Sequence, residues 1–438
     1  MQQKSSDTQN LPPWLKNFGM GLFGVFILIF IVPLLALKKT ILLFLPAPKE
    51  LPTLADKEHR DRIDLKVVTN TPMQDTQDAV VDKTRALIDK GAWLELADLM
   101  QQWDQDRATC AGGKSLAELA LDTALHWLSS GYISASYCQF VKTAIIDDDV
   151  AQKMEDLAAL HNDNYIFVVL AAHVRMTQGW AARGPEYAHN VSDSGWATME
   201  QRFEKATWLL SRADPTTLNS PLLASAHFEL LSFIPDADKK LDEAYLTWSS
   251  LDPRNQTPHI QYGYKLLPRW YGSSQRLHIA AQKAALRTQA ETGAAAYASM
   301  YLEPLRSGDL VLLDMDTSLF HQGILDLADI SNNDPVAVAG IIQTLFDGVQ
   351  MASYPPDDLP DEQSAVWLPH AKDLYRTYTE LVSTRLHAIR PFAWHRGRAG
   401  ALMYITSACR QAFDDGATFK LSENGLETFM PDNPSSAD

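Results

Sequence analysis

The sequence is poor in cysteine, and the few it has are far apart. Cys110, Cys138 and Cys409 are the three cysteines among 438 residues. Their odd number leaves at least one thiol unpaired, and the absence of a CxxC pair argues against a zinc ribbon or a thioredoxin-type motif. We expect no disulfide framework. A reducing compartment is favoured, although a periplasmic protein without disulfides also fits.

Motifs of known catalytic sites are missing as well. The twelve histidines form no HExxH motif, and no Gly-x-Ser-x-Gly elbow is present. Residues 108–115 come closest to a phosphate loop, but Ala108 stands where the first Gly belongs and an amphipathic helical stretch precedes it. We interpret the segment as a turn between helices, in which Ser115 caps the second helix. No catalytic residue, cofactor or metal site is predicted.

Positive charge is scarce outside the N-terminal region. The net charge is −16, and the first 50 residues carry +3, from five Lys and two acidic residues, which leaves −19 for the remainder. Such a surface repels nucleic acid phosphates and anionic lipid headgroups, so neither is expected as a partner of the broad surface. The simplest role of this charge is solubility.

An apolar segment without charge lies at residues 20–37. At about 1.5 Å per residue a helix over this run is roughly 27 Å long, close to the hydrocarbon thickness of a bilayer. Trp14 and Lys16 precede it, and Lys38 and Lys39 follow it, as interfacial anchors do. The pattern predicts one transmembrane helix, in a bacterial inner membrane. A cleaved signal peptide is the alternative, but its apolar core is shorter and needs a small-x-small cleavage site.

The orientation of this segment depends on a nearly balanced count of lysines. Two Lys precede the run and three follow it before residue 50. By the positive-inside rule this count slightly favours a cytoplasmic soluble part, and both orientations stay open.

The remaining chain is predicted to be all-α. We expect a polar tail at 1–19, an interfacial piece and Pro-containing linker at 38–72, a helical repeat domain at 73–416, and a flexible tail at 417–438. No strand pair around an Asn-Gly or Asp-Gly turn is expected. Residues 311–315 are the one plausible short strand and fit a helix equally well.

A repeat of about 38 residues appears when helix ends are aligned. Asp214-Pro215 and Asp252-Pro253 each follow an Ala- and Trp-containing helix, and each precedes a helix that begins with Pro, at Pro221 and Pro258. A third Asp-Pro pair lies at 334–335. These endings resemble the second helices of tetratricopeptide repeats, which implies an α-solenoid of helical hairpins.

Two further segments, at residues 268–273 and 293–301, are similar to a bacterial family of unknown function, number 4034. The resemblance covers about residues 160–305. It implies a tetratricopeptide-like helical domain and no activity, because the family offers no catalytic residue to carry over.

Two clusters combine Arg with aromatic residues, the types that dominate binding hot spots. The first comprises Arg269, Trp270 and Tyr271, and the second Arg390, Trp394 and Arg396. Each could instead serve packing between helices. We predict a membrane-anchored scaffold that binds another protein. The alternatives are an enzyme with an anion-binding groove and a structural subunit of an envelope complex, and the oligomeric state stays open.

Overall fold

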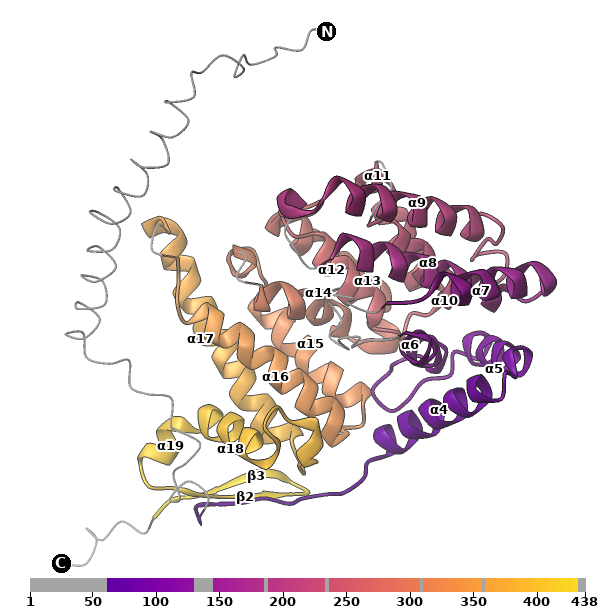
Figure 1. Cartoon of the computed structure of the whole chain (residues 1–438). Helices are drawn as coiled ribbons and strands as arrows, with labels where there is room; N and C mark the ends of the chain where they lie inside the picture. Colours follow the sequence, from indigo (N-terminus) through magenta and orange to yellow (C-terminus); the bar gives the residue numbers. More distant parts are fainter. Residues whose placement is uncertain are drawn as a thin grey trace, which may run out of the picture. The chain divides into compact units, whose positions relative to one another are not determined.

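The computed structural model describes residues 61–129, 145–184, 188–232, 236–307, 310–356 and 359–431. This part is 70% helical, with 16 α-helices, which confirms the predicted helical class (Figure 1). The predicted transmembrane helix at 20–37, the tail at 1–19 and the linker up to residue 60 lie outside the described residues.

The first seven helices run from residue 72 to residue 230. They are α4 (Pro72–Asp89), α5 (Trp93–Gln105), α6 (Leu116–Leu128), α7 (Asp148–Leu160), α8 (Tyr165–Arg183), α9 (Asp193–Leu210) and α10 (Pro221–Leu230). The next nine are α11 (Ala237–Leu251), α12 (Thr257–Lys265), α13 (Ser274–Thr292), α14 (Ala295–Arg306), α15 (Thr317–Ile330), α16 (Pro335–Ala352), α17 (Asp361–Arg385), α18 (Gly397–Ala408) and α19 (Arg410–Asp414). Short 3-10 turns are η2 (Ala188–Asn190), η3 (Leu310–Leu313) and η4 (Pro391–Ala393). Residues 311–315 therefore begin in a helical turn rather than a strand.

Local capping signals position several of these helices. The Ser115 hydroxyl accepts a hydrogen bond from the Glu118 N–H at 3.3 Å and begins α6, as predicted, while α5 precedes this turn as a helix. Thr71 caps α4 in the same way, with Pro72 at its first position. Gly91 has a φ of +67° and ends the α4 region.

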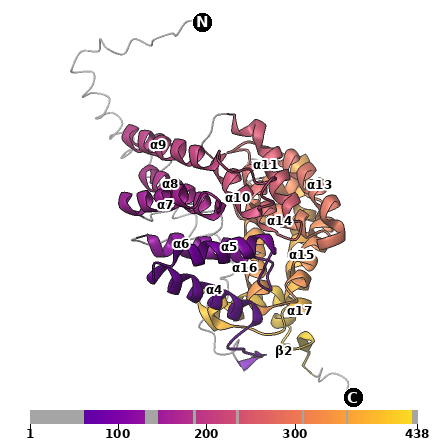
Figure 2. The same cartoon turned by 90° about the vertical axis from the view of Figure 1, so that its right-hand side faces the viewer.

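Most helices pack against neighbours one or two places away in the chain. Examples are α8 with α7 and α9, α14 with α12 and α15, and α17 with α15 and α16. Figure 2 shows α4 to α9 lying over one another in successive layers. Apolar side chains between these layers form two cores, one over α4–α10 and one over α10–α19 together with the sheet.

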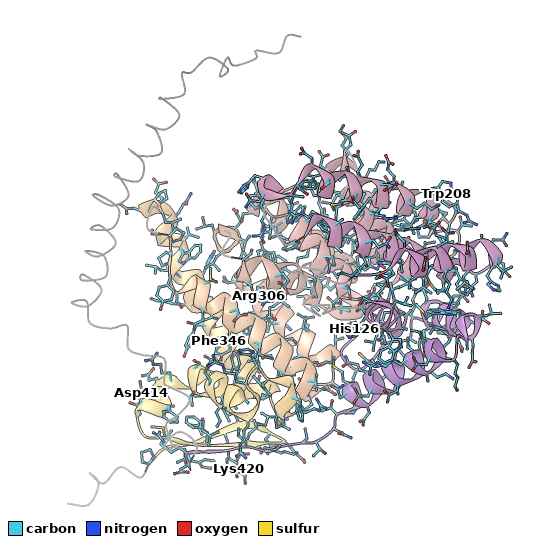
Figure 3. All side chains as sticks on the ribbon, in the orientation of Figure 1. His126, Trp208, Arg306, Phe346, Asp414 and Lys420 are labelled. Carbon is cyan, nitrogen blue, oxygen red and sulfur yellow. The ribbon has the colours of Figure 1, made fainter. Side chains whose placement is uncertain are left out.

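The predicted helix ends at the Asp-Pro pairs are confirmed in the first two cases. α9 and α11 end before these pairs, and Pro221 and Pro258 lie in the first turns of α10 and α12. Trp208 and Trp248 differ, however: Trp208 is 54% exposed on α9 (Figure 3), and Trp248 is buried. They stand seven and five residues before their respective Pro, which places them on different helix faces.

The third Asp-Pro pair has another role. Asp334 is the N-cap of α16, and its carboxylate accepts hydrogen bonds from the Val336 N–H at 2.9 Å and the Met73 N–H at 3.0 Å. It therefore starts a helix and ties that helix to α4, instead of ending a repeat.

α16 is the one described helix long and apolar enough to cross a membrane. Its inner face, which includes Ile342, Leu345 and Phe346, is buried in the core of the helical part. Its composition is therefore explained by burial between its neighbours.

The C-terminal segment differs from its prediction as a flexible tail. β1 (Ile63–Asp64), β2 (Thr418–Ser422) and β3 (Gly425–Phe429) form a three-stranded sheet in the order β1-β2-β3, parallel between β1 and β2 and antiparallel between β2 and β3. Phe419 and Leu421 alternate with exposed Lys420 and bury one face, and Gly425 follows the turn with a φ of +99°. The expectation that no Asn-Gly hairpin exists was wrong at Asn424-Gly425. Residues beyond 431 lie outside the described part.

The linker prediction is also corrected for residues 61–71. This segment is extended, but it is bound into the fold: β1 pairs with β2, and Val67 pairs with Ile389 in a parallel bridge. Figure 1 shows it beside β2 and β3 before it reaches α4.

Candidate interaction sites

The first predicted cluster lies in the turn between α12 and α13. Trp270 is half-buried against the core, and the Lys265 ammonium lies 4.4 Å from its ring centroid. The Tyr271 hydroxyl donates to the Leu231 carbonyl at 3.4 Å. Arg269 is exposed, with its guanidinium 5.3 Å from the ring centroid of Tyr264. Packing between helices therefore accounts for the two aromatic residues.

The second predicted cluster lies in the connection from α17 to α18, residues 390–398, which we call the arginine loop. Trp394 is buried, with its ring centroid 5.5 Å from that of Tyr404. Arg390 donates from Nε to the Thr69 carbonyl at 3.1 Å, and this contact joins the loop to the segment before α4. Arg396 is exposed, with a left-handed φ of +67°, and α18 begins after it without a side-chain cap.

The arginine loop is held firmly by one side chain of α16. Gln343 donates to the Ala393 carbonyl at 2.9 Å and accepts from the His395 N–H at 2.8 Å. Phe392, between these anchors, is 91% exposed. Trp394 was the candidate aromatic residue for binding, with burial at a helix junction as the alternative. The structure confirms its burial and exposes Phe392, which sequence reasoning passed over.

The two clusters therefore occupy separate connections between helices. Of the six predicted residues, Arg269 and Arg396 are exposed, and the other four are partly or fully occupied by contacts within the protein.

Four exposed apolar residues that were not predicted lie near the end of α16 and in the second turn of α17. Met351 is 45% exposed, Tyr354 72%, Val366 40% and Leu368 54%. Trp367 stands between the last two, is buried, and donates from Nε1 to the Ala352 carbonyl at 2.8 Å, which joins the two helices. We call these four exposed residues the apolar tip. Its only sequence signal was the presence of apolar residues on both sides of Trp367.

A buried polar seam connects α6 with α12. Glu118 accepts hydrogen bonds from Asn255 Nδ2 at 3.2 Å and from Thr257 Oγ1 at 3.4 Å. Burial raises the pKa of Glu118 to about 7, and Lys114, which is ion-paired to Asp122 at 3.0 Å, partly opposes that rise. The carboxyl group therefore titrates near neutral pH.

Neighbouring charges in this seam are used to join helices. Arg107 donates to the Leu251 carbonyl at 2.9 Å and the Asn219 carbonyl at 3.0 Å. Asp104 accepts from the Tyr165 hydroxyl at 2.6 Å and from the Leu222 N–H at 2.9 Å. Burial raises the pKa of Asp104 despite these bonds. The seam is consequently a structural junction between the first three helices and the middle of the array.

Histidines in the interior are likewise engaged in packing contacts. His259 Nδ1 lies 2.8 Å from the Tyr245 hydroxyl, and burial lowers the pKa of His259 to about 3, so its imidazole is neutral. His321 lies between Thr377, at 3.1 Å, and Glu380, at 3.5 Å, which resembles a proton relay. The Thr377 hydroxyl is buried and donates to the Asp373 carbonyl, so it is not available as a nucleophile.

The described residues contain no group of three or more His, Cys, Asp or Glu side chains that could hold a metal ion. Comparison with family models, with curated proteins and with solved structures found no match for this chain. The resemblance to the family of unknown function therefore stays a prediction that rests on its short motifs.

Proposed function

We propose that this chain is a membrane-anchored helical-repeat scaffold that binds another protein through the apolar tip. The observation that carries the proposal is the exposure of Met351, Tyr354, Val366 and Leu368 on one helical hairpin. Several exposed apolar residues on one helical hairpin are candidates for a surface that a partner covers. Tyr354 supplies the amphipathic aromatic group that is common at binding hot spots.

The helical part supports a scaffold role through its pattern of packing. Helices that contact mainly their neighbours along the chain can form an extended array, and such arrays commonly present long binding surfaces. We take the array to be an α-solenoid of tetratricopeptide-like hairpins.

The anchor in this proposal is the uncharged run at 20–37, placed as a single transmembrane helix in a bacterial inner membrane, with the helical part on the cytoplasmic side. Anchoring raises the local concentration of the scaffold for partners at the membrane. Protease accessibility of the helical part in spheroplasts tests this side: protection in intact spheroplasts is expected, and cleavage there would place the helical part outside.

Affinity purification of the full chain from detergent-solubilised membranes tests partner binding. We compare the wild type with a Tyr354→Ser, Leu368→Ser variant and with Leu286→Ser, which alters another exposed apolar residue, 74% exposed on α13. A partner recovered by the wild type and Leu286→Ser, and lost from the tip variant, is expected. Recovery of the same partners by a folded tip variant would remove the apolar tip from the proposal.

A structural subunit of an envelope complex is the second candidate, because the same apolar tip would suit a permanent subunit contact. It predicts recovery of the partner in fixed stoichiometry that resists dilution, whereas a scaffold with exchangeable partners releases them.

A further inference from the structure

We propose that the arginine loop docks on the anionic phospholipid headgroups of the membrane that anchors this chain, with Phe392 inserted into the interface. The inference rests on the proposed membrane anchor and assigns a second contact with the same bilayer. It uses a surface different from the apolar tip.

Charge is distributed in an unusual way around this loop. The chain carries −16 overall, yet residues 386–413 contain no Asp or Glu and include Arg390, Arg396, Arg398 and Arg410. Arg396 and Arg398 are exposed, and neither takes part in a salt bridge within the described residues. They form a local positive surface on an otherwise acidic protein.

Acidic groups from neighbouring elements are already neutralised by partners. Asp347 of α16 lies near Tyr404 and pairs with Arg306 at 3.1 Å, and Glu423 pairs with Lys66 at 3.0 Å. Neither pairing involves the exposed guanidinium groups of the loop.

The backbone adds to this positive surface. α18, twelve residues long, begins at Gly397 with no side-chain cap, and its N-cap residue is Arg396. In α18, as in several other described helices, no side-chain oxygen accepts from the first N–H groups. Here the positive end of the helix dipole faces the same region as Arg396 and Arg398, and both favour a phosphate group.

Phe392 supplies the apolar part of the surface. It is 91% exposed although the flanking segment is fixed by Gln343 and by the buried Trp394, so its exposure is a property of an ordered loop. One protruding aromatic ring beside arginines suits insertion among lipid headgroups, where the ring is buried and the guanidinium groups meet phosphates.

Connectivity places this loop next to the segment that leads from the anchor. Arg390 bonds to the Thr69 carbonyl, and Val67 pairs with Ile389. In the sequence, 23 residues, 38 to 60, separate the run at 20–37 from this segment. In this proposal the short connection limits how far the loop can move from the bilayer, and repulsion of the acidic remainder from anionic lipid favours contact through this face.

Tryptic cleavage of the full chain in lipid nanodiscs tests the docking. One set of discs contains phosphatidylcholine alone and the other contains phosphatidylglycerol at about one third. The rate of cleavage after Arg396 and Arg398, measured by mass spectrometry, is compared with cleavage after exposed Arg269 in the same digest. We expect the loop to be cut at least about five-fold more slowly in the anionic discs at low salt, and this protection to weaken at high salt because screening shortens the electrostatic range.

Variants separate lipid docking from other causes of protection. Phe392→Ser is expected to remove most of the protection, and Leu286→Ser, an exposed apolar residue on α13, is expected to leave it unchanged. Equal cleavage rates in the two kinds of disc, with the chain stably inserted, would overturn the docking and leave the anchor intact. Equal protection by a soluble polyglutamate peptide without lipid would overturn it in favour of an acidic protein partner. Failure of the chain to insert into discs would contradict the proposed transmembrane helix. The docking would then be tested by flotation with anionic vesicles, and absence of flotation would overturn it as well.

Discussion

Glu118 is the residue whose ionisation has the clearest consequence for stability. Its pKa rises from 4.5 in the unfolded chain to about 7 in the folded one, so folding favours its protonated form. Protonated Glu118 therefore contributes to the free energy of unfolding at low pH, and this contribution is lost as the pH rises from 4.5 to 7. We expect Glu118→Gln, which keeps the bonds to Asn255 and Thr257 without a charge, to be more stable than the wild type by about 1–3 kcal/mol at pH 8. Urea denaturation at several pH values measures this difference.

The gain from Glu118→Gln must shrink as the pH falls towards 5, because the wild-type carboxyl group becomes protonated there. Glu95→Gln is the matched control, since Glu95 is exposed and pairs only with exposed Lys83 at 3.3 Å. A gain for Glu118→Gln that did not change with pH would contradict the assignment of its pKa.

Arg175 is a nearly buried cation that joins α8 to α7. It donates to Glu155 at 2.6 Å and to Gln178 at 2.9 Å, and lies 3.4 Å from Asp148, which also binds Arg202. Without Arg175, the nearly buried Glu155 carboxylate would keep only its pairing with the more exposed Lys205, at 3.0 Å. We expect Arg175→Ala to lower the free energy of unfolding by about 3–5 kcal/mol. In a double-mutant cycle with Glu155→Ala, the double variant should lose less than the sum of the single losses; simple additivity would show that the pair is not coupled.

At the scale of elements, the crossing of α12 and α14 depends on Gly263. A Cβ atom at this position would lie 2.2 Å from the Met300 carbonyl oxygen, which belongs to backbone and cannot rotate away. Gly263→Ala should therefore force the helices apart and destabilise the protein by at least about 2 kcal/mol. Thermal unfolding followed by circular dichroism is a suitable measurement.

Gly340 of α16 is the control for the thermal unfolding of Gly263→Ala, because it has room for a side chain. Nothing lies within 4 Å of the Cβ that Ala would add there, so the substitution changes mainly helix propensity. Gly340→Ala is expected to stabilise by up to about 1 kcal/mol. If both substitutions shifted the melting temperature in the same direction, the close approach of α12 and α14 would not be the controlling factor.

At the scale of the whole folded part, the segment before α4 packs against the C-terminal hairpin, about 350 residues away in the chain. We call this contact, between residues 61–69 and 413–429, the clasp. Arg62 donates to the Ala417 carbonyl at 3.0 Å and the Phe413 carbonyl at 2.6 Å, and its guanidinium lies 3.8 Å from the Phe413 ring centroid. We expect Arg62→Ala to weaken the clasp by about 2–3 kcal/mol, since charged donors would be lost from partly buried carbonyls. Hydrogen exchange should accelerate at 61–69 and 413–429.

The rate of amide hydrogen exchange in α8, which is buried in the core over α4–α10, is expected to change little with Arg62→Ala. Arg376→Ala serves as a control, because Arg376 is largely exposed and pairs only with a neighbour on its own helix. Uniform acceleration through α8 would show that the clasp controls global unfolding rather than a local one.

Local sequence signals determined much of the secondary structure. Ser115 as a cap, and Pro221 and Pro258 in first turns, act within one turn of the chain, and each was predicted. The apolar run at residues 165–172 lies in α8 and is buried throughout.

The sheet could not be predicted because its partners are distant in sequence. Five-residue strands at the C-terminus are too short to be stable alone, and they are completed by Ile63 and Asp64 from the other end of the helical part. The strand pattern at 418–429 was present in the sequence, but the residues that cover it become neighbours only after folding.

By itself, the sequence determined the helices, their caps, the acidic surface and the charge-free run at 20–37, since each of these depends on residues adjacent in the chain. Only the tertiary structure decided which side chains are buried. It buried Trp394 and exposed Phe392 two residues earlier, and it placed the Glu118 carboxyl group under α12. Burial and the pKa shifts that follow from it depend on elements brought together from distant parts of the chain, and no local pattern records which elements will meet.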